Sequence, residues 1–436
     1  MEDKKYIVAL EIGSSHIAGV VASVTAQADA SIVCYHEVPI VDCVRYGSIF
    51  NVDEVCTKTK ELLRRITADR HVSPFRIDSV YLTFGGRSLH SERVAIDRDI
   101  NETIPVSQDF IDTLKREAAS KFDSKNVVEV LPSKYELDGA VVNPIGAIGS
   151  HLHAEMNVVL CRPQMRHNLQ MVFDRLQIRV NGYITTPVAA AQSLLSSEER
   201  RLGCMYVDHG AETTTVAIYK DNGLRYLNVL PMGSRNITRD LCSLSLLDEQ
   251  AEKVKINYGD AMATTASLPA AEIAGINAAD IANYVFTRTG EMVENVYYQL
   301  QIADIPADDL KAGIVATGRG MRLKGMAERL ADATKMKVRI AQFPGIDSSS
   351  ELSKIPQLLS VVEWISSQPT VANCMSVPPM PENDDPNPPV EEPVKEAAKI
   401  KDGTDKPQKP KKPGIFGKFW KAIGDTMSGD GMDDEM

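Results

Sequence analysis

Apolar runs of strand length alternate with helix-like segments from residue 1 to about residue 372. Such alternation indicates an α/β fold. The first apolar run, residues 6–12, ends at the polar turn 13–15, and a second apolar run, residues 17–24, follows immediately. Two strands joined by so short a turn form a β-hairpin, whose turn can offer backbone N–H groups and hydroxyls to an anion. The pattern therefore predicts an anion-binding hairpin near the start of the chain.

The same layout recurs about two hundred residues later. Residues 204–208 are strand-like, residues 209–212 form a polar turn, and residues 213–219 are strand-like again. A single hairpin of this kind is more often a structural turn than a binding site. Two copies in this order predict two similar lobes with a cleft between them.

A helix-like segment with paired charges fits this cleft. Residues 251–259 have a helical pattern that ends at a glycine. Glu252 and Lys255 lie three residues apart, which places both on one face of the helix. The two side chains are predicted either to hold the ribose and base of a nucleotide or to form an ordinary surface ion pair.

A glycine-rich turn is also predicted to line the cleft. The buried-type strand 312–316 runs into the turn 317–320, and a helix is predicted from about residue 323 to residue 331. Glycines at a strand-to-helix turn permit close approach of the backbone to a ligand, and a helix N-terminus attracts anions.

Composition narrows the class of protein. Of the 436 residues, 43% are hydrophobic and 25% are charged, which is typical of a globular chain. The net charge of −11 argues against a nucleic-acid-binding protein. No apolar run approaches the roughly 18 residues that span a bilayer, and no secretory signal pattern is present. We therefore expect a cytoplasmic protein. Its seven cysteines have no CxxC or other metal spacing and are expected to be incidental thiols.

The end of the chain has a different composition. Residues 373–412 are rich in proline, lysine and acidic residues, which predicts a disordered, partly extended linker. The apolar side chains of the segment 413–428, drawn as a helix, fall within one arc of roughly 140°. The apolar residues of this arc are Ile415, Phe416, Phe419, Trp420, Ile423 and Met427, and the lysines outside it are Lys418 and Lys421. This pattern is typical of a helix lying in the interface of an anionic membrane; the alternative is a helix that docks into a protein groove.

The order of these motifs resembles that of the actin, sugar-kinase and chaperone ATPase superfamily. Within it, the chain resembles the FtsA family of bacterial cell-division proteins over essentially its whole length. Residues 80–88 are similar to the point where that family inserts an extra subdomain, and residues 130–135 and 143–146 match the pattern inside that subdomain. The resemblance implies an α/β, actin-like, two-lobed ATPase fold with an FtsA-type inserted subdomain, a linker and a C-terminal amphipathic helix.

The resemblance also implies a division of the chain. The implied segments are a first lobe at 1–85 and 164–202, an inserted self-association subdomain at 86–163, a second-lobe core at 203–235 and 312–372, a small subdomain at 236–311, a linker at 373–412, a membrane-targeting helix at 413–428 and an acidic tail at 429–436.

ATP with Mg²⁺ is the ligand that the resemblance implies for the cleft. The residues that match the nucleotide-binding motifs are Gly13, Ser14, Ser15, His16, Gly210, Ala211, Glu212, Thr213, Glu252, Lys255, Gly318, Arg319 and Gly320. Glu11 and Asp208 match the carboxylates that hold Mg²⁺ through a bound water.

Several of these positions depart from the family pattern. Glu11 stands where the family has Asp, His16 where it has Lys, and Glu212 and Arg319 where it has Gly. Neutral histidine is a poor counter-charge for phosphate. The Glu212 carboxylate is expected to repel phosphate oxygens unless a cation intervenes. We therefore expect weakened ATP binding and at most a weak ATPase.

The resemblance implies an adaptor rather than a metabolic enzyme. It implies that the subdomain 236–311 binds the C-terminal peptide of FtsZ, and that the chain tethers FtsZ filaments to the cytoplasmic face of the inner membrane at the division site. Self-association into filaments and recruitment of other division proteins are also implied. Arg288 and Glu291 match the partner-binding stretch, and a solvated helix face is the alternative for them. A sugar or acetate kinase and a pilus-assembly or chaperone-like protein of the same fold are the rival classes.

Overall fold

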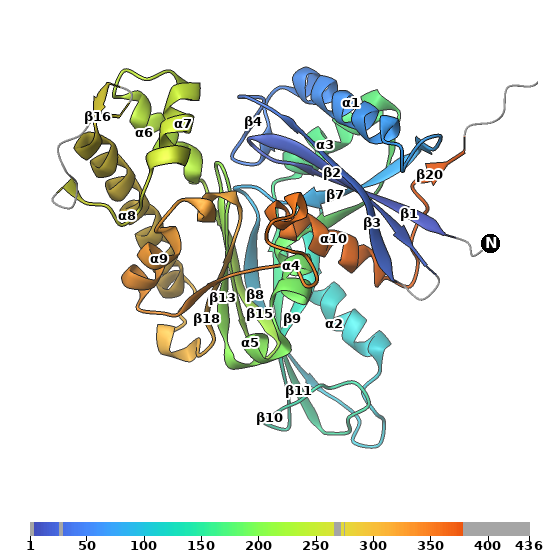
Figure 1. The fold of residues 1–436 in the computed structure, drawn as a ribbon. Helices are drawn as coiled ribbons and strands as arrows, with labels where there is room; N and C mark the ends of the chain where they lie inside the picture. The colour runs from blue at the N-terminus through green and yellow to red at the C-terminus, as the bar shows by residue number, and fades with distance from the viewer. Residues whose placement is uncertain (1–3, 26–28, 266–271, 274, 378–436) are drawn as a thin grey trace, which may run out of the picture. The chain divides into compact units, whose positions relative to one another are not determined.

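The first apolar runs form a five-stranded sheet in the computed structural model, which describes residues 4–25, 29–265, 272–273 and 275–377 (Figure 1). The predicted hairpin is present, because β1 (Lys5–Ile12) pairs antiparallel with β2 (His16–Val24). The strand order of the sheet is β12-β7-β1-β2-β3, and β7 (Ser79–Phe84) runs parallel to β1. The central residues of β1 and β2 are buried on both faces, which explains their continuous apolar sequence.

Helix α1 (Val52–Ala68) covers one face of this sheet. It begins where Asn51 caps it, since the Asn51 side chain accepts the Glu54 N–H at 3.2 Å. A buried stripe that includes Val55, Leu62 and Ile66 faces the strands. The remaining elements of this first lobe are β3 (Ala30–Pro39), β4 (Val44–Arg45), β5 (Ser48–Ile49), β6 (Arg76–Ile77), α3 (Pro163–Leu176), β12 (Arg179–Thr185) and α4 (Thr186–Leu194).

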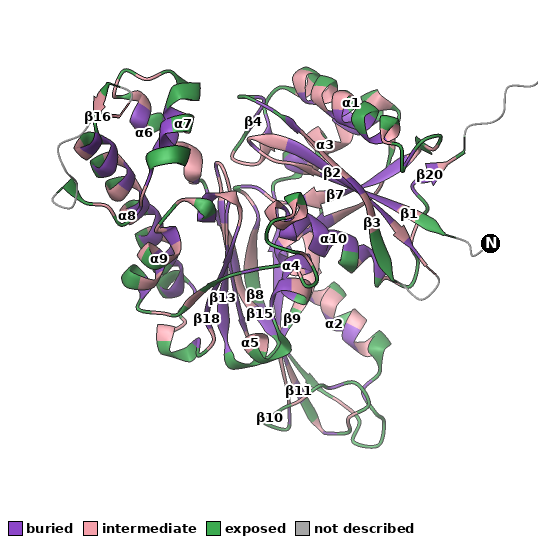
Figure 2. Cartoon of the chain, viewed as in Figure 1, coloured by how far each residue is buried: buried purple, intermediate pink, exposed green. Residues whose placement is uncertain are grey.

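The second predicted hairpin lies in a nine-stranded sheet of order β10-β9-β11-β8-β15-β14-β13-β18-β19. Here β13 (Cys204–His209) pairs antiparallel with β14 (Thr214–Lys220) and parallel with β18 (Gly313–Thr317). Figure 2 shows these central strands as largely buried. The other elements of this lobe are α5 (Ser197–Leu202), β15 (Gly223–Leu230) and β19 (Val338–Ile340).

The inserted subdomain extends this second sheet. Its elements are β8 (His90–Asp99), α2 (Gln108–Ser120), β9 (Val127–Leu137), β10 (Ala140–Val141) and β11 (His151–Leu160). The two groups of strands join at β8 and β15, where His90 pairs with Asn228. The charged run 92–99 lies on β8, whose Val94 and Ile96 are buried while its charged residues are exposed.

The small subdomain is mainly helical. It contains α6 (Ser234–Cys242), α7 (Asp248–Tyr258), β16 (Glu272–Ile273), β17 (Ile276–Asn277) and α8 (Ala278–Ile302). Its core joins Ile237, Leu241, Val254, Val285 and Met292. Three short 3₁₀ helices, Ala307–Asp309, Arg319–Arg322 and Glu351–Lys354, lie farther along the described chain.

Three expected boundaries differ from the structure. The helix predicted to begin near residue 323 is α9 (Met326–Thr334), because Gly325 adopts a left-handed conformation and separates it from the preceding 3₁₀ helix. Helix α10 (Pro356–Ser366) was expected with the second lobe, but its apolar side chains lie in the core of the first lobe. The linker was expected from residue 373, yet β20 (Met375–Ser376) pairs with β6, so the folded part continues to this strand.

The linker beyond residue 377, the predicted membrane helix and the acidic tail lie outside the described residues. In the part of the chain that is described, none of the helices combines the length and apolar character needed to cross a membrane.

Candidate functional site

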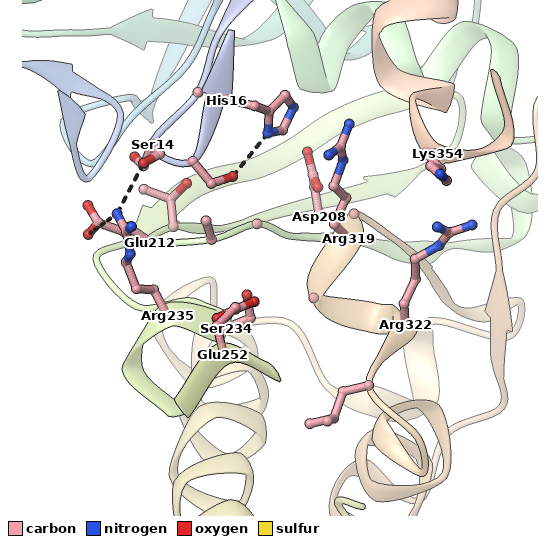
Figure 3. Close-up of a pocket in the computed structure, with 18 of the residues that line it drawn as sticks. Ser14, His16, Asp208, Glu212, Ser234, Arg235, Glu252, Arg319, Arg322 and Lys354 are labelled. Atoms are coloured by element: carbon pink, nitrogen blue, oxygen red, sulfur yellow. Dashed lines mark hydrogen bonds and ion pairs between the residues drawn. The ribbon is translucent and has the colours of Figure 1, made fainter. Parts of the chain in front are cut away.

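A cavity of about 730 Å³ opens where the turns of the two hairpins meet (Figure 3). Its volume falls within the range of about 300–1,000 Å³ that is usual for small-molecule sites. All thirteen residues predicted to contact a nucleotide line it, and so do Glu11 and Asp208. The prediction that these distant segments meet at one cleft is therefore confirmed.

The two turns have the same local geometry. The Gly13 N–H donates to the His16 carbonyl at 3.0 Å, and the Gly210 N–H donates to the Thr213 carbonyl at 2.9 Å. A Cβ atom at either glycine would lie 3.1–3.2 Å from that carbonyl oxygen, which is tighter than ordinary contact. Glycine is therefore favoured at both positions by the close turn itself.

Two carboxyl groups enter the cavity from equivalent strands. Glu11 lies on β1 and Asp208 lies on β13, and Gln357 Nε2 donates to Asp208 Oδ1 at 2.8 Å. Burial, reinforced by the nearby Asp208 carboxylate, raises the pKa of Glu11 to about 7. Burial raises the pKa of Asp208 to about 6, against the hydrogen bond from Gln357. Two carboxyl groups that resist ionisation in this way are suited to share a divalent cation.

Replacing Glu11 with glutamine should change the pH dependence of stability. Because the pKa of Glu11 rises from 4.5 to about 7 on folding, the folded chain retains a proton that the unfolded chain releases between these values. Stability therefore falls as pH rises through this window. We expect Glu11→Gln to match the wild type near pH 4 and to exceed it above pH 7 by roughly 1–3 kcal/mol. Urea unfolding across this pH range measures the difference, and parallel profiles of the two proteins would refute the assignment.

Glu212 lines the cavity as predicted, but its carboxylate is paired with cations of this chain. Its side chain has no exposed area, and Arg239 Nη2 donates to Glu212 Oε1 at 2.5 Å. Arg235 Nη1 lies 3.8 Å from the same oxygen, and the Tyr46 N–H donates to Glu212 Oε2 at 2.8 Å. The expected repulsion of phosphate by this carboxylate is therefore reduced, because two guanidinium groups and a backbone N–H surround it.

These contacts join the two lobes. Tyr46 belongs to the first lobe, whereas Glu212, Arg235 and Arg239 belong to the second. Arg235 Nη1 also donates to the Ser14 carbonyl at 3.3 Å. Figure 3 shows Ser14, Glu212 and Arg235 on one side of the cavity and the cations of Arg319, Arg322 and Lys354 on the other.

Arg319 makes a second bridge between the lobes. Its guanidinium forms an ion pair with Glu37 of β3 and donates to Tyr35 Oη at 3.1 Å. Burial opposes ionisation of Glu37, but hydrogen bonds from Arg319 and Tyr35 outweigh it and lower the pKa to about 2. Burial, assisted by Arg319, lowers the pKa of His16 to about 4, so His16 is neutral near pH 7 and supplies no charge to a phosphate.

Lys255 forms the ion pair with Glu252 that the sequence analysis gave as one alternative, and it makes two further contacts that the sequence did not reveal. Its Nζ donates to Glu252 Oε2 at 2.7 Å, to Thr238 Oγ1 at 2.9 Å and to the Ser234 carbonyl at 3.3 Å. An ammonium group has three N–H donors, so these acceptors use all of them. Lys255 therefore joins α7 to α6, and the partly exposed Glu252 is the member of the pair that is available to a ligand.

Several residues that line the cavity were not predicted from the sequence, namely Glu37, Ser234, Arg235, Arg322, Lys354 and Gln357. They come from β3, α6, α10 and the 3₁₀ helices, and none lies in a motif whose spacing signals a ligand. Arg322 has no ion-pair partner among the described residues, which makes it a cation available to an anionic ligand.

The predicted partner-binding residues lie away from this cavity, on α8. Arg288 Nη2 donates to Asp240 Oδ1 at 3.0 Å and Arg288 Nε donates to Asp240 Oδ2 at 2.5 Å. Arg288 also pairs with Glu291 one turn along the helix. An acidic partner therefore has to compete with two carboxylates of this chain for the guanidinium.

Two family models match this chain, one over the inserted subdomain and one over most of the second lobe. A sequence model of the cell division protein FtsA matches residues 205–362, and a model of the SHS2 domain inserted in FtsA matches residues 86–160. The second match coincides with the inserted subdomain formed by β8 to β11.

Individual relatives cover most of the chain. It is 27% identical over 369 residues to the cell division protein FtsA of Porphyromonas gingivalis, covering 81% of this chain and 76% of that protein. It is 24% identical over 380 residues to FtsA of Escherichia coli K12, covering 83% of this chain and 89% of that protein. Among solved structures, the PilM-PilN type IV pilus biogenesis complex matches with a TM-score of 0.59 and 16% identity, covering 83% of this chain and 99% of the matched chain. The structural match shows the actin-like fold alone.

Proposed function

Because the chain belongs to the FtsA family of actin-like cell-division proteins, we propose that it tethers FtsZ filaments to the cytoplasmic face of the inner membrane at the division site. The observation that carries the proposal is the joint match of the FtsA model and the inserted-domain model in their proper order. Self-association through the inserted subdomain and recruitment of further division proteins belong to the same proposal. The sequence of residues 413–428, with its aromatic face and opposing lysines, supports the membrane contact.

ATP with Mg²⁺ is the ligand that we propose for the cavity. The cavity volume and its two glycine turns fit a nucleotide, and the charge of the Glu212 carboxylate is balanced by its arginines. The turns 13–16 and 210–213 would hold the phosphates, Glu11 and Asp208 the cation through its water, and Glu252 the ribose. Mg²⁺ would neutralise phosphate charge there. His16 is neutral, and the ammonium group of Lys255 is already hydrogen-bonded within the protein. Both features support weak binding of ATP and little ATP hydrolysis.

The docking surface proposed for the FtsZ peptide is the small subdomain. Arg288 on α8 offers a guanidinium that is 28% exposed. Elsewhere on the subdomain, α7 and the residue before it expose the apolar side chains of Leu247, Ile256 and Tyr258, of which Ile256 lines the cavity. A cation and exposed apolar side chains on one subdomain suit a short peptide that carries both apolar and acidic groups.

Co-sedimentation with anionic liposomes tests the tether. Full-length protein should bring FtsZ into the liposome pellet, and FtsZ that lacks its C-terminal peptide should stay in the supernatant. The physical reason is that the adaptor holds the filament and the membrane through separate surfaces. If the protein sediments with liposomes while intact FtsZ remains in solution, the proposed division role is wrong.

Arg288 calls for a matched pair of variants in the same assay. Charge reversal at Arg288 would also set two carboxylates against each other, because Asp240 already binds the guanidinium. Arg288→Gln should weaken FtsZ recruitment about tenfold, the loss of one charge-assisted hydrogen-bonding group. Asp240→Asn should preserve or strengthen recruitment, since it leaves the guanidinium less occupied. Equal weakening by both variants would indicate that the pair only supports the subdomain.

A further inference from the structure

Three potential metal ligands gather on the first sheet, away from the cavity. They are Cys34 and His36 on β3 and Asp69 directly after α1, and their donor atoms all lie within 4.8 Å of one another. Residues two apart on a strand share a face, so Cys34 and His36 lie together opposite Tyr35 and Glu37. Glu37 lines the cavity, whereas the other face of β3 packs against α1. The cluster is therefore separate from the nucleotide cleft.

The carboxylate of this cluster is held in place by its own turn. The His71 N–H donates to Asp69 Oδ1 at 2.9 Å, and His36 Nε2 lies 2.9 Å from Asp69 Oδ2. The backbone of Asp69 is fixed as well, because its N–H donates to the Ile66 carbonyl at 3.1 Å and its carbonyl accepts the Val72 N–H at 2.9 Å. A ligand carboxylate oriented by an outer hydrogen bond is a regular feature of metal sites.

The strand that supplies the other two ligands is irregular at this point. Val21 of β2 pairs with Cys34, but the next residue, Ala22, pairs with Ile32, so Val33 is the extra residue of a bulge. Bulges re-aim side chains and are enriched beside functional sites. The cluster is also accessible, since the His36 and Asp69 side chains are 29% and 19% exposed while Cys34 is buried.

We propose that Cys34, His36 and Asp69 bind Zn²⁺, with water or a second molecule as the fourth ligand. Thiolate, imidazole and carboxylate are the three side-chain groups that zinc takes in proteins, and thiolate selects zinc over magnesium and calcium. Thiolate and carboxylate together carry two negative charges, which balance the charge of the ion. The spacing of a cysteine, a histidine two residues later and an aspartate after the next helix gave no sequence signal, because only the fold brings α1 back against β3.

Metal analysis of the purified full-length chain tests this site. We expect one zinc per chain after equilibration with Zn²⁺ and removal of excess by a weak chelator. Cobalt in place of zinc should produce the near-ultraviolet charge-transfer absorption of a cobalt–thiolate bond. Cys34→Ser should abolish that absorption and weaken zinc binding by more than about tenfold, since loss of even an outer-shell partner costs that much. Cys56→Ser, which alters a half-buried thiol on α1 itself, should leave both signals unchanged.

A second variant guards against misfolding. His36 is partly exposed, so His36→Gln should fold normally and still weaken zinc binding by a similar factor. Retention of zinc by Cys34→Ser and His36→Gln to the wild-type level would overturn the proposal, and so would the absence of bound zinc or of the cobalt–thiolate absorption in the wild type. In either case Cys34 would be a core thiol beside a His36–Asp69 ion pair. Zinc binding is measured without FtsZ, nucleotide or membrane, so its result is independent of the proposed tethering function.

Discussion

Replacing Glu212 with alanine should lower the free energy of unfolding by about 3 kcal/mol, the lower end of the cost of breaking a buried ion pair. Alanine would leave Arg235, which is 14% exposed, without an ion-pair partner among the described residues and would leave the Tyr46 N–H without its acceptor. The value is set at the lower end because Arg239 is 40% exposed and water compensates part of its loss. Urea unfolding near neutral pH measures the change.

Two further variants separate the parts of this interaction. Glu212→Gln retains an acceptor for the Tyr46 N–H but lacks the charge, so its loss of stability should lie between those of alanine and the wild type. Glu252→Ala removes a carboxylate that is 43% exposed in the same cavity and should cost less than half as much. Equal destabilisation by Glu212→Ala and Glu252→Ala would contradict the buried bridge that the structure assigns to Glu212.

The same bridge predicts a local effect on motion. Through the hydrogen bond from Tyr46, Glu212 joins the turn 210–213 of the second lobe to the loop of the first lobe that contains Tyr46. Loss of the contact should therefore raise hydrogen exchange at Tyr46 and its neighbours before the rest of the sheet, since local opening then requires one bond fewer. Wild-type exchange at Tyr46 in the alanine variant would show that other contacts hold the lobes together.

The sequence was sufficient for the hairpins because their signals are local. Continuous apolar strands around a glycine turn specify β1–β2 and β13–β14 without reference to the rest of the chain. Recurrence of the hairpin was enough to predict that the two turns meet at one cavity.

The direction of the charged side chains was not predictable in this way. Glu212 was expected to face phosphate, but Arg235 and Arg239 on α6 draw it into the protein. Lys255 was predicted either to reach a ligand or to pair with Glu252; it pairs with Glu252, and Thr238 and the Ser234 carbonyl complete its hydrogen bonds. Each partner lies on a different element, so the sequence spacing around Glu212 or Lys255 contains no trace of it.

Long-range packing explains the boundary errors. Helix α10 is apolar on most sides, which signals burial but does not say against which sheet, and it packs on β1 and α4. The inserted strands likewise show no signal for the edge that they join, because one ladder pair, His90 with Asn228, and side-chain hydrogen bonds such as that from Asn157 to the Leu224 carbonyl connect them to β15. The packing of α10 and the pairing of the inserted strands both depend on contacts between segments that are far apart in the sequence.

Replacing Phe419 and Trp420 together with glutamate should abolish binding to anionic liposomes. Both side chains lie on the predicted apolar face of residues 413–428, a segment outside the described residues. Burial of two large side chains contributes about 3–6 kcal/mol, so their loss corresponds to roughly a 10²- to 10⁴-fold weaker affinity. Flotation with liposomes measures the bound fraction, and the folded part of the chain should unfold at an unchanged urea concentration.

Substitutions that keep the apolar face provide the matched control. Phe419→Leu with Trp420→Leu should retain most of the binding, whereas Lys418→Gln with Lys421→Gln should weaken it by about 1 kcal/mol per lysine and reduce its sensitivity to salt. Wild-type binding by the double glutamate variant would exclude this segment as the membrane contact. If that variant leaves the membrane but still binds FtsZ in solution, the two attachments of the tether are physically separate. The membrane helix then acts only as the anchor, and the folded domains select the filament.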